Sequence, residues 1–135
     1  MYSKVTHAIE VTVEPTYLKD QSSHKAGHYV WAYTVRICNL GTSTVKLNYR
    51  YWKIIDANGK LEQVEGEGVV GIQPTIKAGE SFEYSSGSHL TTPSGMMMGN
   101  YDFCYLTVDG DENSTFSVEI PAFSLDTPNN KAILN

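Results

Sequence analysis

Long apolar runs, positive charge and cysteine are all scarce in this 135-residue chain. No stretch approaches the roughly 18 apolar residues that a membrane-spanning helix needs, and the opening M-Y-S-K-V-T-H-A-I-E-V lacks the apolar centre of a signal peptide. Ten basic and fifteen acidic residues give a net charge of -5, which disfavours broad binding to nucleic acid or to anionic membranes. We therefore expect a cytoplasmic protein with no nucleic-acid and no membrane partner.

The cysteines number only two, Cys38 and Cys104. Together with Trp52 they are spaced much like the Cys, Trp and Cys of an immunoglobulin domain, so a disulfide is one alternative. However, Cys38 falls on the face opposite to the apolar alternation around it, and Asp102 stands where an antibody domain has its corner tyrosine. These positions and the expected reducing compartment predict two free thiols.

Helical periodicity is almost absent as well, whereas apolar and polar residues alternate repeatedly along the chain. The clearest alternation predicts strands over 29–39 and 45–56, and Asn58-Gly59 predicts a hairpin turn after the second. Shorter strands are expected over these ranges: 7–13, where Pro15 ends the strand, 61–64, 81–84, 96–108, and 115–120, which Pro121 interrupts.

Seven to nine short strands with turns about every ten residues are typical of an all-β fold, an antiparallel immunoglobulin-like β-sandwich. A small barrel is the alternative. No repeat or linker is evident, so the chain is predicted to form one domain over 1–135, with a core over about 9–125 and a polar tail over 126–135. Trp31 and Trp52 are expected near the centre of the core.

Residues 66–71 read G-E-G-V-V-G, which matches the G-x-G-x-x-G pattern of dinucleotide-binding turns. That chemistry needs a helix after the turn, because the helix N-terminus holds the pyrophosphate. Here Pro74 and Gly79 follow closely, and no acidic residue lies near position 91 to hold a ribose. The sequence therefore excludes a dinucleotide-binding turn of this kind.

Two interpretations of this glycine loop remain. Its amides could form an anion-binding nest, with charge from Arg50 or Lys77, although Glu65 and Glu67 oppose an anion. Alternatively, the glycines serve turns or bulges, and Val69-Val70 packs on the sandwich. The second interpretation is favoured because short glycine motifs often match by chance.

Candidate metal ligands have simpler explanations. His24 and His28 have the spacing of a metal-binding helix face, but they lie in a predicted loop. In a strand, Met97 points away from Met96 and Met98, which favours packing over a soft-metal site. We expect no metal site and no cofactor.

Candidate catalytic groups are equally weak. Ser85 and Ser86 are close to His89 in sequence only, and no G-x-S-x-G turn is present. Asp109 and Asp111 are explained by a turn. The run N-Y-R-Y-W at 48–52 could bind a peptide or single-stranded nucleic acid, but an arginine packed among aromatic residues is the commoner outcome. The sequence therefore predicts no catalytic residue.

An ordered set of motifs resembles the ApaG family over nearly the whole chain, from about residue 9 to residue 123. The motifs are Y-V-W-A-Y-T-V-R-I-C-N-L-G at 29–41, W-K-I-I-D-A-N-G at 52–59, V-E-G-E-G-V-V-G-I-Q-P at 64–74, Y-S-S-G at 84–87 and T-P-S-G-M-M-M-G-N-Y at 92–101. The chain departs from the family at Tyr51, where a histidine usually precedes the tryptophan, and over 102–115.

The resemblance implies a fibronectin type III-like β-sandwich in a bacterial cytosolic protein. It also implies a link to cobalt and magnesium resistance and to diadenosine polyphosphate metabolism. Related domains resemble protein-binding modules, and the family offers no established catalytic residues to carry over.

We therefore expect a non-enzymatic binding module with a protein partner, which can also form a homodimer through a sheet edge. The alternative is a binder of phosphate, pyrophosphate or a nucleotide through the glycine loop. The candidate surface comprises these residues: Gly66, Glu67, Gly68, Val69, Val70, Gly71, Arg50, Ser85, Ser86 and Gly87.

Overall fold

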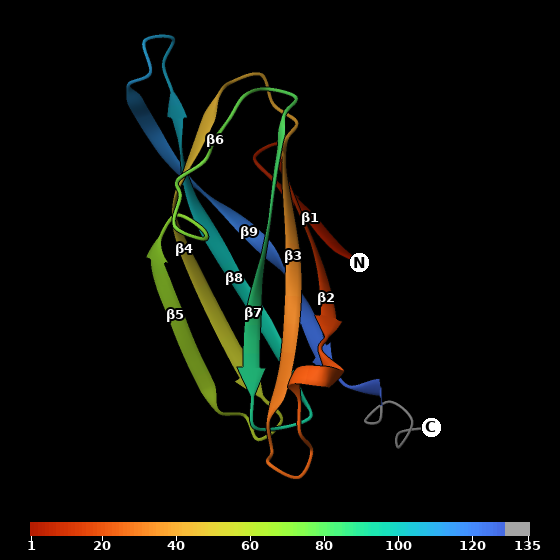
Figure 1. The fold of residues 1–135 in the computed structure, drawn as a ribbon. Helices are drawn as coiled ribbons and strands as arrows, with labels where there is room; N and C mark the ends of the chain where they lie inside the picture. Colours follow the sequence, from red (N-terminus) through yellow and green to blue (C-terminus); the bar gives the residue numbers. More distant parts are fainter. Residues whose placement is uncertain (129–135) are drawn as a thin grey trace.

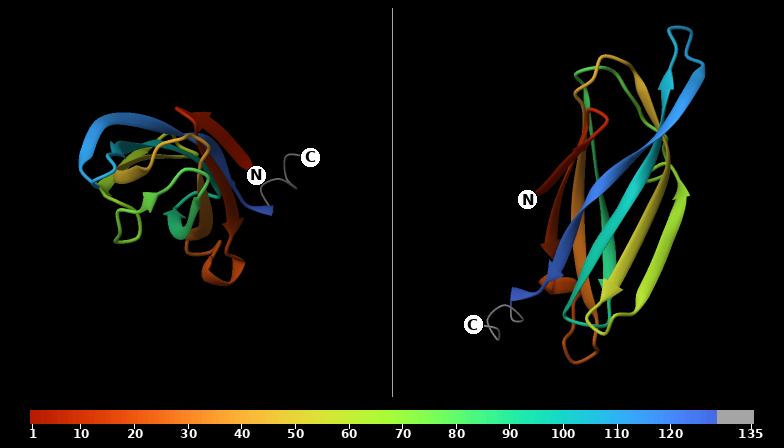
Figure 2. Two further views of the ribbon diagram at one scale, coloured as in Figure 1. Left: turned by 90° about the horizontal axis from the view of Figure 1, so that it is seen from above. Right: turned by 180° about the vertical axis from the view of Figure 1, so that it is seen from behind.

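Alternating side chains build two antiparallel sheets that pack face to face in the computed structural model, which describes residues 1–128 (Figure 1 and Figure 2). The predicted tail over 126–135 lies mostly outside the described residues. The first sheet has the order β1-β2-β3-β7, with β1 (Tyr2–Thr6), β2 (Ile9–Tyr17), β3 (Tyr29–Asn39) and β7 (Ser81–Leu90).

The second sheet has the order β5-β4-β8-β9. Its strands are β4 (Val45–Asp56), β5 (Leu61–Glu67), β8 (Ser94–Leu106) and β9 (Glu112–Asp126), and the short β6 (Thr75–Ile76) also pairs with β4. One 3-10 helix, η1 (Lys19–Gln21), precedes β3. The predicted all-β antiparallel sandwich is confirmed, with nine strands in the described residues.

The core lies between the sheets because every second side chain points inward. Its apolar members on the first sheet include Ile9, Val11, Val13, Trp31, Val35 and Ile37. Trp31 and Trp52 are both buried, as predicted, and the Trp31 indole donates a hydrogen bond to the carbonyl of Asp126 at 2.9 Å. The end of β9 is thereby held to β3, an inner strand of the first sheet.

Along the long strand β4, the alternation of inward and outward side chains changes phase part-way. Its register with β8 shifts between Leu47 and Tyr49, as a β-bulge does. Beyond the shift, Arg50 lies opposite the fully buried Tyr101. Residues directly opposite one another share a face of the sheet, so Arg50 faces inward and Tyr51 faces outward.

Two predicted strand ends are wrong, and both involve proline. Pro15 lies inside β2, at a point beyond the end of β1, whose last partner on β2 is Val13. One side of β2 is therefore unpaired there, and a residue without an N–H is tolerated. Pro121 lies inside β9, where the register with β8 shifts between Met97 and Gly99 and supplies a bulge.

Other boundaries also differ from the prediction. The chain turns at His7 and Ala8, both with positive φ, so the expected strand over 7–13 starts at Ile9 and an unpredicted β1 precedes it. β7 continues through the polar run 85–88 to Leu90 because it pairs with β3 along its whole length. Both cysteines are free, as predicted.

One side of the sandwich is closed and the other is open. On the closed side, Lys4 of β1 forms an ion pair with Glu119 of β9, and the Glu119 amide donates to the Thr6 hydroxyl at 3.3 Å. On the opposite side, β5 and β7 are the last strands of their sheets (Figure 1). The predicted site residues lie on this open side.

Candidate functional site

The glycine motif straddles the end of β5. Gly66 and Glu67 are the last residues of the strand, and the loop proper begins at Gly68. Gly68 has a φ of +61°, and a Cβ there would overlap the carbonyl oxygen of Ile72. Gly71 has a φ of +84° but open space around its Cα. Backbone conformation therefore explains both loop glycines, and close approach explains the first.

Three of the loop amides are hydrogen-bonded within the chain. Gly68 N–H donates to the carbonyl of Asn48 at 2.9 Å, and Val69 and Ile72 exchange N–H···O bonds of 2.8 and 3.0 Å. Val69 is fully buried, whereas Val70 is 56% exposed. Only one of the two valines expected to pack on the sandwich does so.

The Arg50 guanidinium covers the start of this loop. Its Nη1 donates to the carbonyls of Glu67 and Gly68, both at 3.0 Å. A Cβ at Gly66 would come within 3.0 Å of the guanidinium, so the glycine leaves room for it. From Gly71 the chain continues to β6 rather than into a helix, which confirms that this is not a dinucleotide-binding turn.

Ser85, Ser86 and Gly87 lie in β7, in the opposite sheet. Ser86 faces inward beside Tyr33, its partner in the register, and forms a hydrogen bond with the Tyr33 hydroxyl. Ser85 faces outward and lies 2.8 Å from the Thr34 hydroxyl. The structure thus brings Ser86 to the same inner side as Arg50 and leaves Ser85 and Gly87 on the outer face.

Three tyrosine hydroxyls form an inner cluster that the sequence did not indicate. Tyr84 and Tyr101 share a hydrogen bond, and the charge of Arg50 acts on both and on Tyr33. Burial raises the pKa of all three phenols above its usual value, and Arg50 opposes this shift. The phenols therefore stay protonated near neutral pH and serve as hydrogen-bonding groups of the core.

The outer face of β4 carries a pair of tyrosines. Tyr49 and Tyr51 have ring centroids 4.9 Å apart. In the register, Tyr51 lies opposite Glu65 of β5, and Tyr49 lies between Glu67 of β5 and Asp102 of β8. Partial desolvation, and then the hydrogen bond and charge of Asp102, raise the pKa of Tyr51. We call these five residues the acidic tyrosine patch.

Shallow hollows adjoin this patch on both sides. One, of about 440 Å³, is lined by Tyr51, Lys53 and the neighbouring parts of β8 and β9. The other, of about 390 Å³, is lined by both tyrosines, Asp102 and Phe116 among others. Tyr51 borders both hollows, so a ligand on this face would meet its ring.

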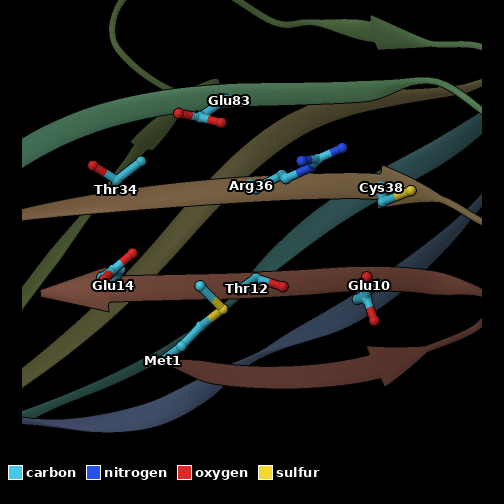
Figure 3. Close-up of a pocket in the computed structure, with 8 residues that line it drawn as sticks. All are labelled: Met1, Glu10, Thr12, Glu14, Thr34, Arg36, Cys38 and Glu83. Atoms are coloured by element: carbon cyan, nitrogen blue, oxygen red, sulfur yellow. The ribbon is translucent and has the colours of Figure 1, made fainter.

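A separate hollow of about 370 Å³ lies on the outer face of the first sheet (Figure 3). Three carboxylates line it, from Glu10, Glu14 and Glu83, and Arg36 lies among them opposite Glu83. Cys38 is at one end. It contains none of the predicted site residues.

The histidines interact with their neighbours. His24 Nδ1 lies 2.7 Å from the Tyr29 hydroxyl, and the rings of His28 and His89 are 4.2 Å apart between centroids. Within residues 1–128, no three His, Cys, Asp or Glu side chains are grouped so as to hold a metal ion. No helix in that range is long and apolar enough to cross a membrane.

Comparison with known proteins supplies the family. The model of the ApaG domain matches residues 19–105, which include β5, the glycine loop and the acidic tyrosine patch. This chain belongs to the ApaG family. Protein ApaG of Brucella anthropi is 53% identical over 135 residues, and that of Paramagnetospirillum magneticum is 51% identical, each alignment covering 100% of both chains.

A solved structure supports the architecture of this ApaG-family chain. The crystal structure of a Bordetella pertussis protein under the name ApaA superposes with a TM-score of 0.82 at 41% identity. The match covers 89% of this chain and 94% of that one. This solved relative therefore shares the sandwich architecture.

Proposed function

We propose that this ApaG-family chain is a non-enzymatic binding module whose partner is another protein, bound at the open side of the sandwich. One observation carries the proposal. The Arg50 guanidinium and the amides of Gly68, Val69 and Ile72, which an anion would need, are already bonded inside the chain, whereas the adjoining strand β5 is the exposed last strand of its sheet. Exposed edges are ready templates for pairing with another chain.

The alternative is a binder of phosphate, pyrophosphate or a nucleotide through Gly66–Gly71. For that chemistry Arg50 would have to leave the carbonyls of Glu67 and Gly68, which would then lack their donor. The neighbouring carboxylates of Glu65 and Glu67 also repel an anion. Both costs favour a protein partner.

The arrangement of β7 supports a role outside catalysis. Ser86 faces inward and His89 faces outward, so they cannot act as a nucleophile and base. Ser85 shares the face of His89, but four strand positions separate them by about 13 Å. That distance is well beyond hydrogen-bonding reach.

We place the module in the cytoplasm, where the two free thiols are stable. Family membership alone suggests links to cobalt and magnesium resistance and to diadenosine polyphosphate metabolism. In this proposal, the partner protein acts in these two processes.

Photo-crosslinking in cells tests the proposal. A photoreactive residue at Gln63, on the exposed β5, is expected to yield a discrete protein adduct. The matched position is Glu14, on the outer face of the other sheet, and it should not yield that adduct. Failure at Gln63, or the same adduct from both positions, would count against a partner at this side.

NMR titration of ¹⁵N-labelled protein tests the alternative. Pyrophosphate, ATP, diadenosine tetraphosphate and Mg²⁺ are expected to leave the amides of 66–73 unshifted. Saturable shifts confined to those amides would establish the anion-binding function instead. Gly68→Ala is unsuited as a control, because its Cβ would disrupt the loop with or without a ligand.

A further inference from the structure

The free edge of β5 carries charge of one sign. Its sequence, L-E-Q-V-E-G-E, holds three glutamates and no basic residue, and every position except Gly66 is exposed. In antiparallel pairing with β4, Glu65 and Glu67 lie opposite Tyr51 and Tyr49 and so share the outer face. The edge is therefore acidic on the side where the tyrosine rings lie.

The acidic tyrosine patch is suited to a cation. The faces of tyrosine rings attract ammonium and guanidinium groups, and nearby carboxylates add charge-assisted hydrogen bonds. Asp102 supplies the carboxylate of the patch on the side away from β5. Lys53 is the basic residue next along this face, opposite Gln63, and it confines the acidic character to the 65–67 end of the edge.

A second copy of this chain does not fit the edge. Antiparallel pairing of two β5 strands would bring six carboxylates along one junction with no base on either strand. Like charges facing each other across strands are destabilising. The charge of the edge therefore selects a basic partner over homodimerisation here.

We propose that β5 receives an extended basic segment of another protein as an added strand, with two Lys or Arg side chains on the acidic tyrosine patch. The inference rests on the proposed function and names the partner's chemistry. Glu65 and Glu67 are two positions apart on one face, so the partner's bases also alternate, as in R-x-R, about 6.6 Å apart. Exposed Val64 on the inner face, next to Glu65, favours a β-branched residue beside the two bases.

A defined peptide tests this chemistry directly. The probe is acetyl-T-V-R-T-R-V-T-amide, and its control carries N-methyl groups on alternate amides, which leaves the charge but prevents strand addition. We expect the probe to bind, to shift the amides of 61–67, and to lose affinity as salt rises. The methylated peptide should not bind detectably.

Charge variants locate the site. Glu65→Gln with Glu67→Gln should weaken the probe about threefold to tenfold, as expected for two exposed charge pairs. The matched double variant, Glu14→Gln with Glu83→Gln, removes the same charge from the other sheet and should leave affinity unchanged. Equal effects of the two double variants, or binding of the methylated peptide, would overturn the proposal.

Two results separate the inference from the proposed function. A protein crosslinked from Gln63 whose binding is unaffected by the Glu65 and Glu67 variants would refute the basic strand and leave the binding module standing. A concentration-dependent dimer that protects the amides of 61–67 would make a second copy the occupant and refute the basic partner. Absence of any adduct from Gln63 would refute the proposed function itself.

Discussion

Replacing Gly68 by alanine tests whether the loop after β5 is a fixed part of the sandwich. The residue has a φ of +61°, and the new Cβ would overlap the Ile72 carbonyl oxygen and lie 2.7 Å from its carbonyl carbon. Because both obstructing atoms belong to the backbone, no side-chain rotation relieves the contact. The loop must therefore move away from its own hydrogen-bonding partners.

The magnitude follows from two contributions. Alanine in the left-handed region costs about 1–2 kcal/mol. Displacing Ile72 also breaks its two hydrogen bonds with Val69, at about 1 kcal/mol each. We expect the free energy of unfolding to fall by about 3–4 kcal/mol, a large part of the roughly 5–15 kcal/mol typical of a domain.

Urea unfolding followed by tryptophan fluorescence measures this loss. The midpoint should fall at unchanged m, and Tm should fall by about 12–16 °C for a domain of this size. Gly71→Ala is the matched control, because Gly71 has a φ of +84° and nothing within 4 Å of its Cβ position. It should cost only the backbone contribution of about 1–2 kcal/mol. Equal losses in the two variants would refute this reasoning.

Three further predictions concern buried groups. Arg50→Met should lower the free energy of unfolding by about 2–3 kcal/mol, measured in urea, because two loop carbonyls lose a charged donor. Burial raises the pKa of Tyr84 and Tyr101 above 10.0, so their contribution to stability is complete below about pH 10 and is lost as pH rises further. Absorbance at 295 nm should show both ionising only with unfolding, and early ionisation of either would contradict this. A thiol reagent should label half-buried Cys38 in the native protein and spare Cys104, which is buried and whose pKa burial raises; labelling of both would be the contrary result.

Alternation predicts those strands whose two faces differ in polarity. β3 and β4 match the predicted ranges 29–39 and 45–56 to the residue because each has a distinct apolar face. β7 was predicted too short because its second half, S-S-G-S, has no such contrast, and the pairing with β3 determines its length. Pro15 and Pro121 were misread for a similar reason, since tolerance of a proline depends on whether a neighbouring strand needs its N–H.

The sequence predicts the nature of the glycine loop, but it does not predict which way the side chains around the loop point. Pro74 and Gly79 correctly indicated that no helix follows the glycines. The inward direction of Arg50 depends on the register shift between Leu47 and Tyr49, which no local pattern signals. The fibronectin type III-like kinship, the partner and the absence of catalysis remain predictions.

Because of the same register shift, the alternation of inward and outward side chains changes phase between the two halves of β4. Leu47 and Tyr49 pair with the consecutive β8 residues Phe103 and Asp102, so Asn48 is the extra residue of the bulge, and removing it would leave the rest of the strand in register. Tyr49 and Tyr51 would stay on the outer face and Trp52 would stay in the core, but the Gly68 N–H would lose the Asn48 carbonyl to which it donates. The extra residue therefore anchors the glycine loop, because its carbonyl accepts hydrogen bonds from the Gly68 N–H and from the Gln73 side chain.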